Sequence, residues 1–273
     1  MLFTVDPEKC KHDGICVIAC GRRLIHMADP KALPLPIEGA EEVCIDCGHC
    51  VAACPTGALS HQTMKPEHCP EVQKELHINM DQAEQFFRSR RSHRAYKDKP
   101  VDRDTLNRLI EIAGYAPSAH NDHPVHLTVI EDPAEVKRLA GLVIDWMRYM
   151  IKENHTLAEM YQFNRIVVDW EMGKDPICRN APHLIIAHAD KEATMANIDC
   201  IIALSHIELA VLPLNLGTTW AGFVMAAINF YPPMTEALGL PVGHSSYGGL
   251  MLGYPKFKFA RIPLRKPPAV IWR

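Results

Sequence analysis

The chain has 273 residues, with 29 basic and 32 acidic side chains and a formal net charge of −3. This length suits one large domain or two ordinary ones. A net charge so close to zero gives no indication of binding to nucleic acid or to an anionic membrane. The most apolar stretch, 198–230, is interrupted by charged and polar residues. We therefore expect a buried helix and its continuation there, and no membrane span.

The ten cysteines of the chain raise the question of redox compartment. Residues 1–7 lack the charged and apolar regions of a secretory signal. We therefore expect a cytoplasmic protein, whose cysteines stay reduced and are available as metal ligands.

Two similar cysteine-rich segments lie within the first 60 residues. The second is a complete C-x2-C-x2-C-x3-C-P run formed by Cys44, Cys47, Cys50 and Cys54. The first is an imperfect copy formed by Cys10, Cys16 and Cys20, with Asp13 at the position of the missing cysteine. Internal similarity indicates two copies of one structural unit. The complete run resembles the bacterial ferredoxin signature, in which the fourth cysteine ligates the other of two iron–sulfur clusters.

The signature predicts that each cluster takes ligands from both segments. One complete [4Fe-4S] cluster is expected on Cys44, Cys47, Cys50 and Cys20. A second cluster is expected on Cys10, Cys16 and Cys54, with Asp13 at the fourth corner. Zinc fits poorly, because structural zinc usually draws on two separated pairs of ligands.

Asp13 leaves the type of the second cluster open. Its carboxylate is a harder ligand than a thiolate and would hold a labile fourth iron. A water or hydroxide on that iron is a second possibility, and loss of the iron to leave [3Fe-4S] is a third. Asp13 could also be an ordinary solvated turn residue beside a permanent three-iron cluster.

After the cysteine module, 1–60, the polar segment 61–79 is expected to be a linker and 80–273 a second domain. Apolar periodicity predicts helices from Asp81, from Asp102, and at about 133–150, 155–172 and 194–212. Strands are predicted at 125–130, 184–189, 218–223, 247–252 and 269–272. This alternation indicates an α+β domain with one sheet. Methionines and aromatic residues in 141–173 indicate either a packing face or an adaptable cap over a flat substrate.

Three segments of the second domain carry polar chemistry. The first is Arg90-Arg91-Ser92-His93-Arg94, whose guanidinium groups around a serine hydroxyl suit a phosphate. The second is the turn-rich loop 116–124, and the third runs from Leu252 to Pro263. Together with Asn180-Ala181-Pro182 and Leu216–Gly222, they resemble, in order, the nitroreductase family of FMN flavoproteins over residues 81–273. The whole chain is similar to the ferredoxin–nitroreductase fusions of anaerobes.

The resemblance implies a mixed sheet flanked by helices, an intertwined homodimer and bound FMN. It implies that the FMN phosphate is held by Arg90, Arg91, Ser92, Arg94, Lys258 and Arg261. It implies further flavin contacts from Pro117, Ser118, Ala119 and Asn121 across the dimer, and from the backbone N–H groups of Ala221 and Gly222. The family's flavin-contacting lysine has no clear match, and Lys174 is only a candidate. His123, where the family often has glutamine, is either a surface histidine or a proton donor.

We therefore expect an FMN-dependent oxidoreductase that receives electrons through two clusters and reduces a nitro, quinone or activated-alkene substrate. The flavin carries the chemistry, so no dedicated catalytic side chain is required. The expected donor is reduced ferredoxin or NAD(P)H; the chain has no G-x-G-x-x-G motif, which favours ferredoxin. The alternatives are an electron relay between redox proteins and a sensor of iron or oxygen.

Overall fold

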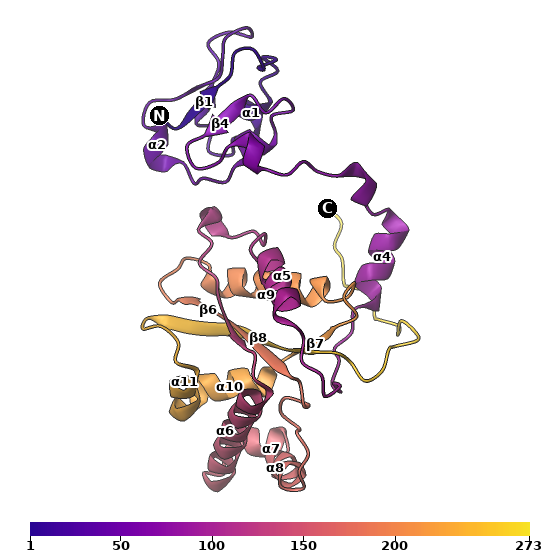
Figure 1. The fold of residues 1–273 in the computed structure, drawn as a ribbon. Helices are drawn as coiled ribbons and strands as arrows, with labels where there is room; N and C mark the ends of the chain where they lie inside the picture. Colours follow the sequence, from indigo (N-terminus) through magenta and orange to yellow (C-terminus); the bar gives the residue numbers. More distant parts are fainter. The chain divides into compact units, whose positions relative to one another are not determined.

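The computed structural model describes all 273 residues, which divide into two compact units (Figure 1). The first unit consists of Met1–His77 together with His120–Asp122. The second consists of Ile78–Ala119 and His123–Arg273. Most of the segment expected as a linker, 61–77, therefore groups with the cysteine module.

The first unit is built from short elements around a small apolar core. Strand β1 (Phe3–Val5) pairs antiparallel with β4 (Leu59–His61), and β2 (Ile25–His26) pairs with β3 (Leu35–Pro36). The helices are α1 (Ile15–Ala19), α2 (Ala40–Val43) and α3 (His49–Ala52), followed by 3-10 turns η1 (Pro66–His68) and η2 (Lys74–Leu76). The core includes Leu2, Phe3, Leu24, Ile25, Val51 and Leu59.

The internal repeat of the sequence is also a repeat of backbone conformation. Helices α1 and α3 begin after Gly14 and Gly48, whose φ angles are 68° and 69°. This left-handed conformation favours glycine. A Cβ at Gly48 would also lie 2.6 Å from the sulfur of Met64. The two glycines thus let each cysteine loop turn tightly into its helix.

The second unit contains a four-stranded sheet in the order β5-β6-β8-β7. Its strands are β5 (His126–Ile130), β6 (His183–Asp190), β7 (Gly217–Trp220) and β8 (His244–Gly253), and all three pairings are antiparallel. Ser92 adds a parallel bridge to Thr218 on the outer edge of β7. Strand β6 is buried over almost its whole length, which fits the apolar run of its centre, residues 184–187.

Helices cover both faces of this sheet (Figure 1). One face packs on α5 (Arg103–Ala113) and α9 (Ala196–Ala210). The other packs on α6 (Pro133–Lys152) and α10 (Gly222–Phe230), with α7 (Thr156–Met160), α8 (Phe163–Glu171) and α11 (Pro232–Leu238) beyond them. Helix α4 (Met80–Ser89) precedes the arginine segment and begins with a capping box at Asn79. The α+β architecture predicted from the sequence is confirmed.

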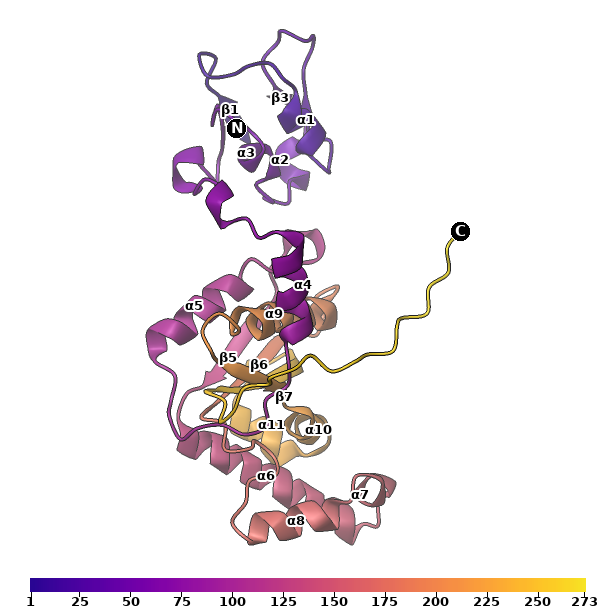
Figure 2. The same cartoon turned by 90° about the vertical axis from the view of Figure 1, so that its right-hand side faces the viewer.

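Most predicted elements of the second unit are present, with three differences. The predicted helix 155–172 is split into α7 and α8, because Gln162 adopts a left-handed φ of 54°. The predicted strand 218–223 ends at Trp220, where α10 follows. The predicted strand 269–272 is wrong: residues 256–273 form no helix or strand, and the end of this segment runs away from the sheet as extended chain (Figure 2). None of the helices combines the length and apolar character needed to cross a bilayer.

Candidate functional site

The four cysteines expected to hold the complete cluster line one cavity of the first unit. Cys44, Cys47 and Cys50 come from the complete run, and Cys20 comes from the imperfect copy. The backbone N–H of Leu24 donates to the sulfur of Cys20 at 3.3 Å. Burial raises the pKa of the Cys50 thiol to about 11, so this group needs a bound metal to become a thiolate. Four convergent sulfurs fit an iron–sulfur cluster.

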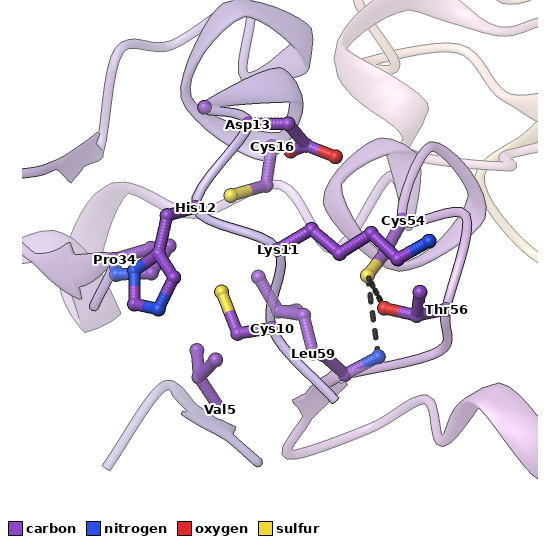
Figure 3. A pocket seen from close by; sticks show the side chains of 12 residues that line it. Val5, Cys10, Lys11, His12, Asp13, Cys16, Pro34, Cys54, Thr56 and Leu59 are labelled. Carbon is purple, nitrogen blue, oxygen red and sulfur yellow. Dashed lines mark hydrogen bonds between the residues drawn. The ribbon is translucent and has the colours of Figure 1, made fainter. Parts of the chain in front are cut away.

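The second expected ligand set lines a separate cavity (Figure 3). The sulfurs of Cys10, Cys16 and Cys54 surround it, and Asp13 lies at its border. Burial opposes ionisation of Cys54, but hydrogen bonds from Thr56 and from backbone N–H groups lower the pKa of its thiol. The N–H of Ala58 is 3.2 Å from this sulfur. Cys54 thus mirrors Cys20, since each accepts the N–H of the residue four positions later.

Asp13 is exposed and belongs to the turn that starts α1. One carboxylate oxygen accepts the N–H of Ile15 at 3.1 Å. The second oxygen has no hydrogen bond and is available to a metal. This geometry fits both the carboxylate ligand and the solvated turn residue, so the type of the second cluster stays open.

The structure adds His61, which sequence reasoning did not identify. This buried histidine ends β4, and its Nε2 lies 3.7 Å from the sulfur of Cys44 and 3.4 Å from a carboxylate oxygen of Asp46. The N–H of Thr63 donates to Nδ1 at 3.3 Å. Nδ1 is therefore an acceptor, and Nε2 carries the hydrogen that points toward Cys44. No sequence pattern identifies His61, because only the pairing of β4 with β1 brings it to the cysteine loop.

In the second unit, the arginine segment is held along the edge of the sheet. The N–H of His93 donates to the carbonyl of Thr218 at 2.9 Å, and Thr219 donates its hydroxyl to the carbonyl of His93. Further along, the N–H of Lys97 donates to the carbonyl of Tyr254 at 2.7 Å. Segments that are far apart in sequence, such as those of Lys97 and Tyr254, therefore meet at one end of β7 and β8.

Positive charge gathers beside this edge. Arg90, Arg91 and Arg265 line one cavity together with Arg88. Burial, and then the nearby charges of Arg265, Arg90 and Arg94, lower the pKa of Arg91. Arg88 pairs with Glu84 within helix α4. Of the other three arginines, Arg90 alone forms an ion pair, with Glu208 at 3.0 Å. Guanidinium groups that are held close together repel one another. An anion such as a phosphate would relieve this repulsion and accept their hydrogen bonds.

A larger cavity lies next to Gly222. Tyr161, Phe163, Trp220 and Phe223 give it aromatic walls, and Arg94 and Arg179 add positive charge. Sequence reasoning missed Arg179, which lies in the turn after Asp175. The segment 141–173 contributes both to the core and to this cavity. Trp146, Met147 and Met150 are buried in the core, whereas Tyr161 is about half exposed and lines the cavity.

The two backbone N–H groups expected at the flavin differ in availability. The N–H of Ala221 donates to the carbonyl of Gly249 at 2.9 Å and so anchors α10 to β8. Gly222 is the first residue of α10, where N–H groups lack partners within the helix. A Cβ built on Gly222 meets no atom within 4 Å. Of the two, Gly222 alone combines an uncommitted N–H with open space for a flat ring.

The remaining expected FMN residues are spread more widely. Pro117, Ser118 and His123 line another cavity, in which the hydroxyl of Ser118 accepts the N–H of His123 at 3.0 Å. The N–H of Ala119 donates to Asp199 at 3.2 Å. Asn121 groups with the first unit, where its side chain donates to the carbonyl of Ile45 at 3.0 Å.

The basic candidates outside the arginine segment also divide. Lys258 donates to the side chain of Asn215 at 3.0 Å, close to the end of the strand that carries Thr218. Arg261 lies in the exposed C-terminal segment. Lys174 is paired with Asp169 at 2.7 Å and does not line the aromatic cavity.

Comparisons with known proteins identify both parts of the chain. The family model "Nitroreductase family" matches residues 87–254, and "4Fe-4S binding domain" matches 40–60. A putative NADH dehydrogenase/NAD(P)H nitroreductase of Archaeoglobus fulgidus is 26% identical over 182 residues, 65% of this chain and 87% of that protein. A protein named Ferredoxin 7Fe from Hydrogenibacillus schlegelii is 38% identical over 55 residues, 20% of this chain and 64% of that protein.

Among solved structures, a nitroreductase of Bacteroides fragilis with bound FMN has a TM-score of 0.57 and 21% identity. The match covers 72% of this chain and 100% of that one, and at this identity it shows a shared fold. Since the nitroreductase model spans more than half of the chain, the chain belongs to the nitroreductase family and carries a 4Fe-4S binding domain in front of its oxidoreductase domain.

Proposed function

We propose that this protein is an FMN-dependent reductase that receives electrons through two iron–sulfur clusters. The single observation that carries the proposal is the sorting of the eight expected ligands into two separate cavities, each with residues from both halves of the repeat. That sorting is what the two-cluster signature requires. It occurs in one chain with a nitroreductase domain.

The cysteines and Asp13 would bind the clusters, which carry electrons one at a time. Cys20, Cys44, Cys47 and Cys50 offer four thiolates for a [4Fe-4S] cluster. Cys10, Cys16 and Cys54 offer three, which supports a [3Fe-4S] cluster or a [4Fe-4S] cluster with a labile iron at Asp13. The name of the related Ferredoxin 7Fe is consistent with the three-plus-four arrangement.

FMN, when bound, would store two electrons and deliver them at its N5 edge to an acceptor. Arg90, Arg91 and Arg94 would bind its phosphate, because they bring three positive charges together and one carboxylate, that of Glu208, pairs with them. Ser92 sits between them on the edge of β7. Gly222 would let the ring approach and would donate an N–H to it. The bound FMN named for the Bacteroides fragilis structure supports the same cofactor.

The acceptor would be a flat molecule that enters the aromatic cavity beside Gly222. Aromatic side chains bind planar rings by stacking, and Arg179 complements the oxygens of a nitro group or quinone. Substrates of this class, including activated alkenes, would be excluded from water by Tyr161 and Phe223. The donor would be a reduced ferredoxin or NAD(P)H, and relatives named for NAD(P)H support the second.

We also propose a homodimer. The C-terminal segment exposes Leu264, Ile271 and Trp272 by 81–96%, although such side chains are usually covered. A second copy of the chain would cover them, and the aromatic cavity of one chain would then be completed by the other. Light scattering coupled to gel filtration measures the oligomeric state directly.

Anaerobic stopped-flow experiments test the proposed function. The protein is reduced by ferredoxin, or separately by NADPH, and then mixed with a nitroaromatic, a quinone or an enone. A reductase reoxidises its flavin with one of these acceptors, whereas a relay reoxidises only with a partner redox protein. Flavin reduction by NADPH at an equal rate in a variant without clusters would contradict the cluster-fed path.

A further inference from the structure

Three histidines that belong to neither site meet on one face of the second unit's sheet. His126 begins β5, His188 lies near the end of β6, and His244 begins β8. His126 and His188 are direct cross-strand partners. Between β6 and β8 the register shifts at Ala187/His188. Such irregularities re-aim side chains, and here the result is a contact between His188 and His244.

The ring centroids of the three histidines are spaced like those of imidazoles around one metal ion, and two of the rings, His188 and His244, already bring nitrogens together. The Nδ1 atoms of His188 and His244 are 2.9 Å apart, so at least one of them lacks a hydrogen. The ring centroids are separated by 5.1 Å for this pair, 4.8 Å for His126 and His244, and 5.6 Å for His126 and His188. Tetrahedral zinc with Zn–N bonds of about 2.0–2.1 Å would place ligand-ring centroids about 5 Å apart.

The surroundings orient His188 as a ligand. Its Nε2 lies 3.0 Å from the hydroxyl of Thr128 on β5. When Nε2 donates to that oxygen, Nδ1 is left without a hydrogen and faces Nδ1 of His244. A ligand histidine typically has its second ring nitrogen fixed in this way. His188 is buried, so its orientation is set by packing.

A second feature at the trio is an orphaned hydroxyl. Ser246 lies opposite His188 on β8, and directly opposed side chains of an antiparallel pair share a face. Its Oγ is buried and has no hydrogen-bond partner. Buried polar groups without partners are rare in proteins. A water molecule on a metal ion at the trio would supply the missing partner.

We propose that His126, His188 and His244 form a binding site for a divalent cation of the zinc class. Three neutral imidazoles select first-row ions such as Zn²⁺ over Mg²⁺ or Ca²⁺, which prefer oxygen. His188 and His244 supply the converging pair, and His126 is exposed, so its ring can turn a nitrogen to the same point at little cost. The bound ion would fix the ends of β5, β6 and β8 to one another, with water or Asp190 as fourth ligand.

The test uses the purified protein with clusters and flavin in place, equilibrated anaerobically with Zn²⁺ alone. Zinc and iron are counted by mass spectrometry, and X-ray absorption at the zinc edge reports the ligands. The expected result is one zinc per chain with a shell of nitrogen and oxygen near 2.0 Å, and unchanged iron. A sulfur shell near 2.3 Å would place the zinc on cysteines and overturn the proposal.

Variants separate this site from adventitious zinc. His126→Asn and His244→Asn change residues that are not buried. Each should lower zinc affinity by more than the roughly 10–100-fold that follows from losing a hydrogen-bond partner of a metal ligand. His77→Asn, at an exposed histidine outside the trio, should bind zinc as the parent does. Zinc should raise the melting temperature of the parent and of the His77 variant only. Absence of bound zinc in the parent, or equal binding by all variants, would refute the site.

Discussion

The ion pair between Arg90 and Glu208 makes replacement of Arg90 a two-part experiment. The side chains are 28% and 12% exposed, and the nitrogen–oxygen distance is 3.0 Å. Arg90→Ala removes one guanidinium from the proposed phosphate site and also leaves the carboxylate of Glu208 without its partner. Hydrogen bonds to charged groups contribute about 1.5–3 kcal/mol. Because water screens part of this pair, we expect a loss of about 1–2 kcal/mol in the stability of the FMN-free protein.

At this size, each 1 kcal/mol corresponds to about 2–4 °C in melting temperature, so Arg90→Ala should melt about 2–8 °C lower. The double variant Arg90→Ala/Glu208→Gln should recover most of this loss, since a neutral amide tolerates the missing partner better than a carboxylate does. FMN affinity should stay lower in both variants by about 1.5–3 kcal/mol, or roughly 10–150-fold, because the phosphate contact is absent from both.

The measurements are thermal unfolding of the FMN-free protein and titration of FMN followed by its fluorescence. Glu208→Gln alone is the matched control: it keeps Arg90 and should bind FMN at least as tightly as the parent. If the double variant regains full FMN affinity, Arg90 acts only through folding and the phosphate assignment is refuted.

Five further variants test other parts of the molecule. Asp13→Cys should convert the second cluster to a stable [4Fe-4S] form and abolish the [3Fe-4S] EPR signal of air-oxidised protein; a parent protein without that signal would contradict the expected lability. His61→Phe removes an N–H directed at Cys44 and should lower the reduction potential of the complete cluster in an EPR-monitored titration; an unchanged potential would show that the contact does not matter. Gly253→Ala puts a Cβ 2.5 Å from Pro182 and should cost about 1–3 kcal/mol in urea unfolding, whereas Gly222→Ala, with open space around it, should cost under about 0.5 kcal/mol; equal costs would argue against this packing. Burial lowers the pKa of His183, so the unfolded chain binds its proton more readily, and this share of stability is complete above the ordinary pKa of about 6.5 and falls as pH drops below it. His183→Gln should therefore flatten the decline in stability between about pH 7 and pH 5. An unaltered slope would show that His183 does not cause this decline.

The cysteine module could be predicted from the sequence in unusual detail, because its spacing is local. Gly14, Gly48 and Asp13 have fixed places within the two cysteine runs, whereas the exchange of Cys20 and Cys54 between the ligand sets is implied by the resemblance to the ferredoxin signature. The same applies to helices such as α5, whose N-cap Asp102 and apolar periodicity are visible in the sequence.

Other features depend on contacts between distant residues and leave no local pattern. The pairing of Arg90 with Glu208 joins positions 118 residues apart. The histidine trio depends on a register shift between β6 and β8, and the Ala221 N–H is occupied by a carbonyl of β8. The segment 269–272 has the composition of a strand but lacks a neighbouring strand to pair with, so its β propensity has no effect.

Anaerobic purification followed by iron counting, FMN extraction and EPR measures both kinds of cofactor in the same sample. We expect about seven to eight iron atoms and one FMN per chain, with EPR signals from two distinct clusters. Four or fewer iron atoms after full anaerobic reconstitution, or flavin absent from the protein, would contradict this expectation.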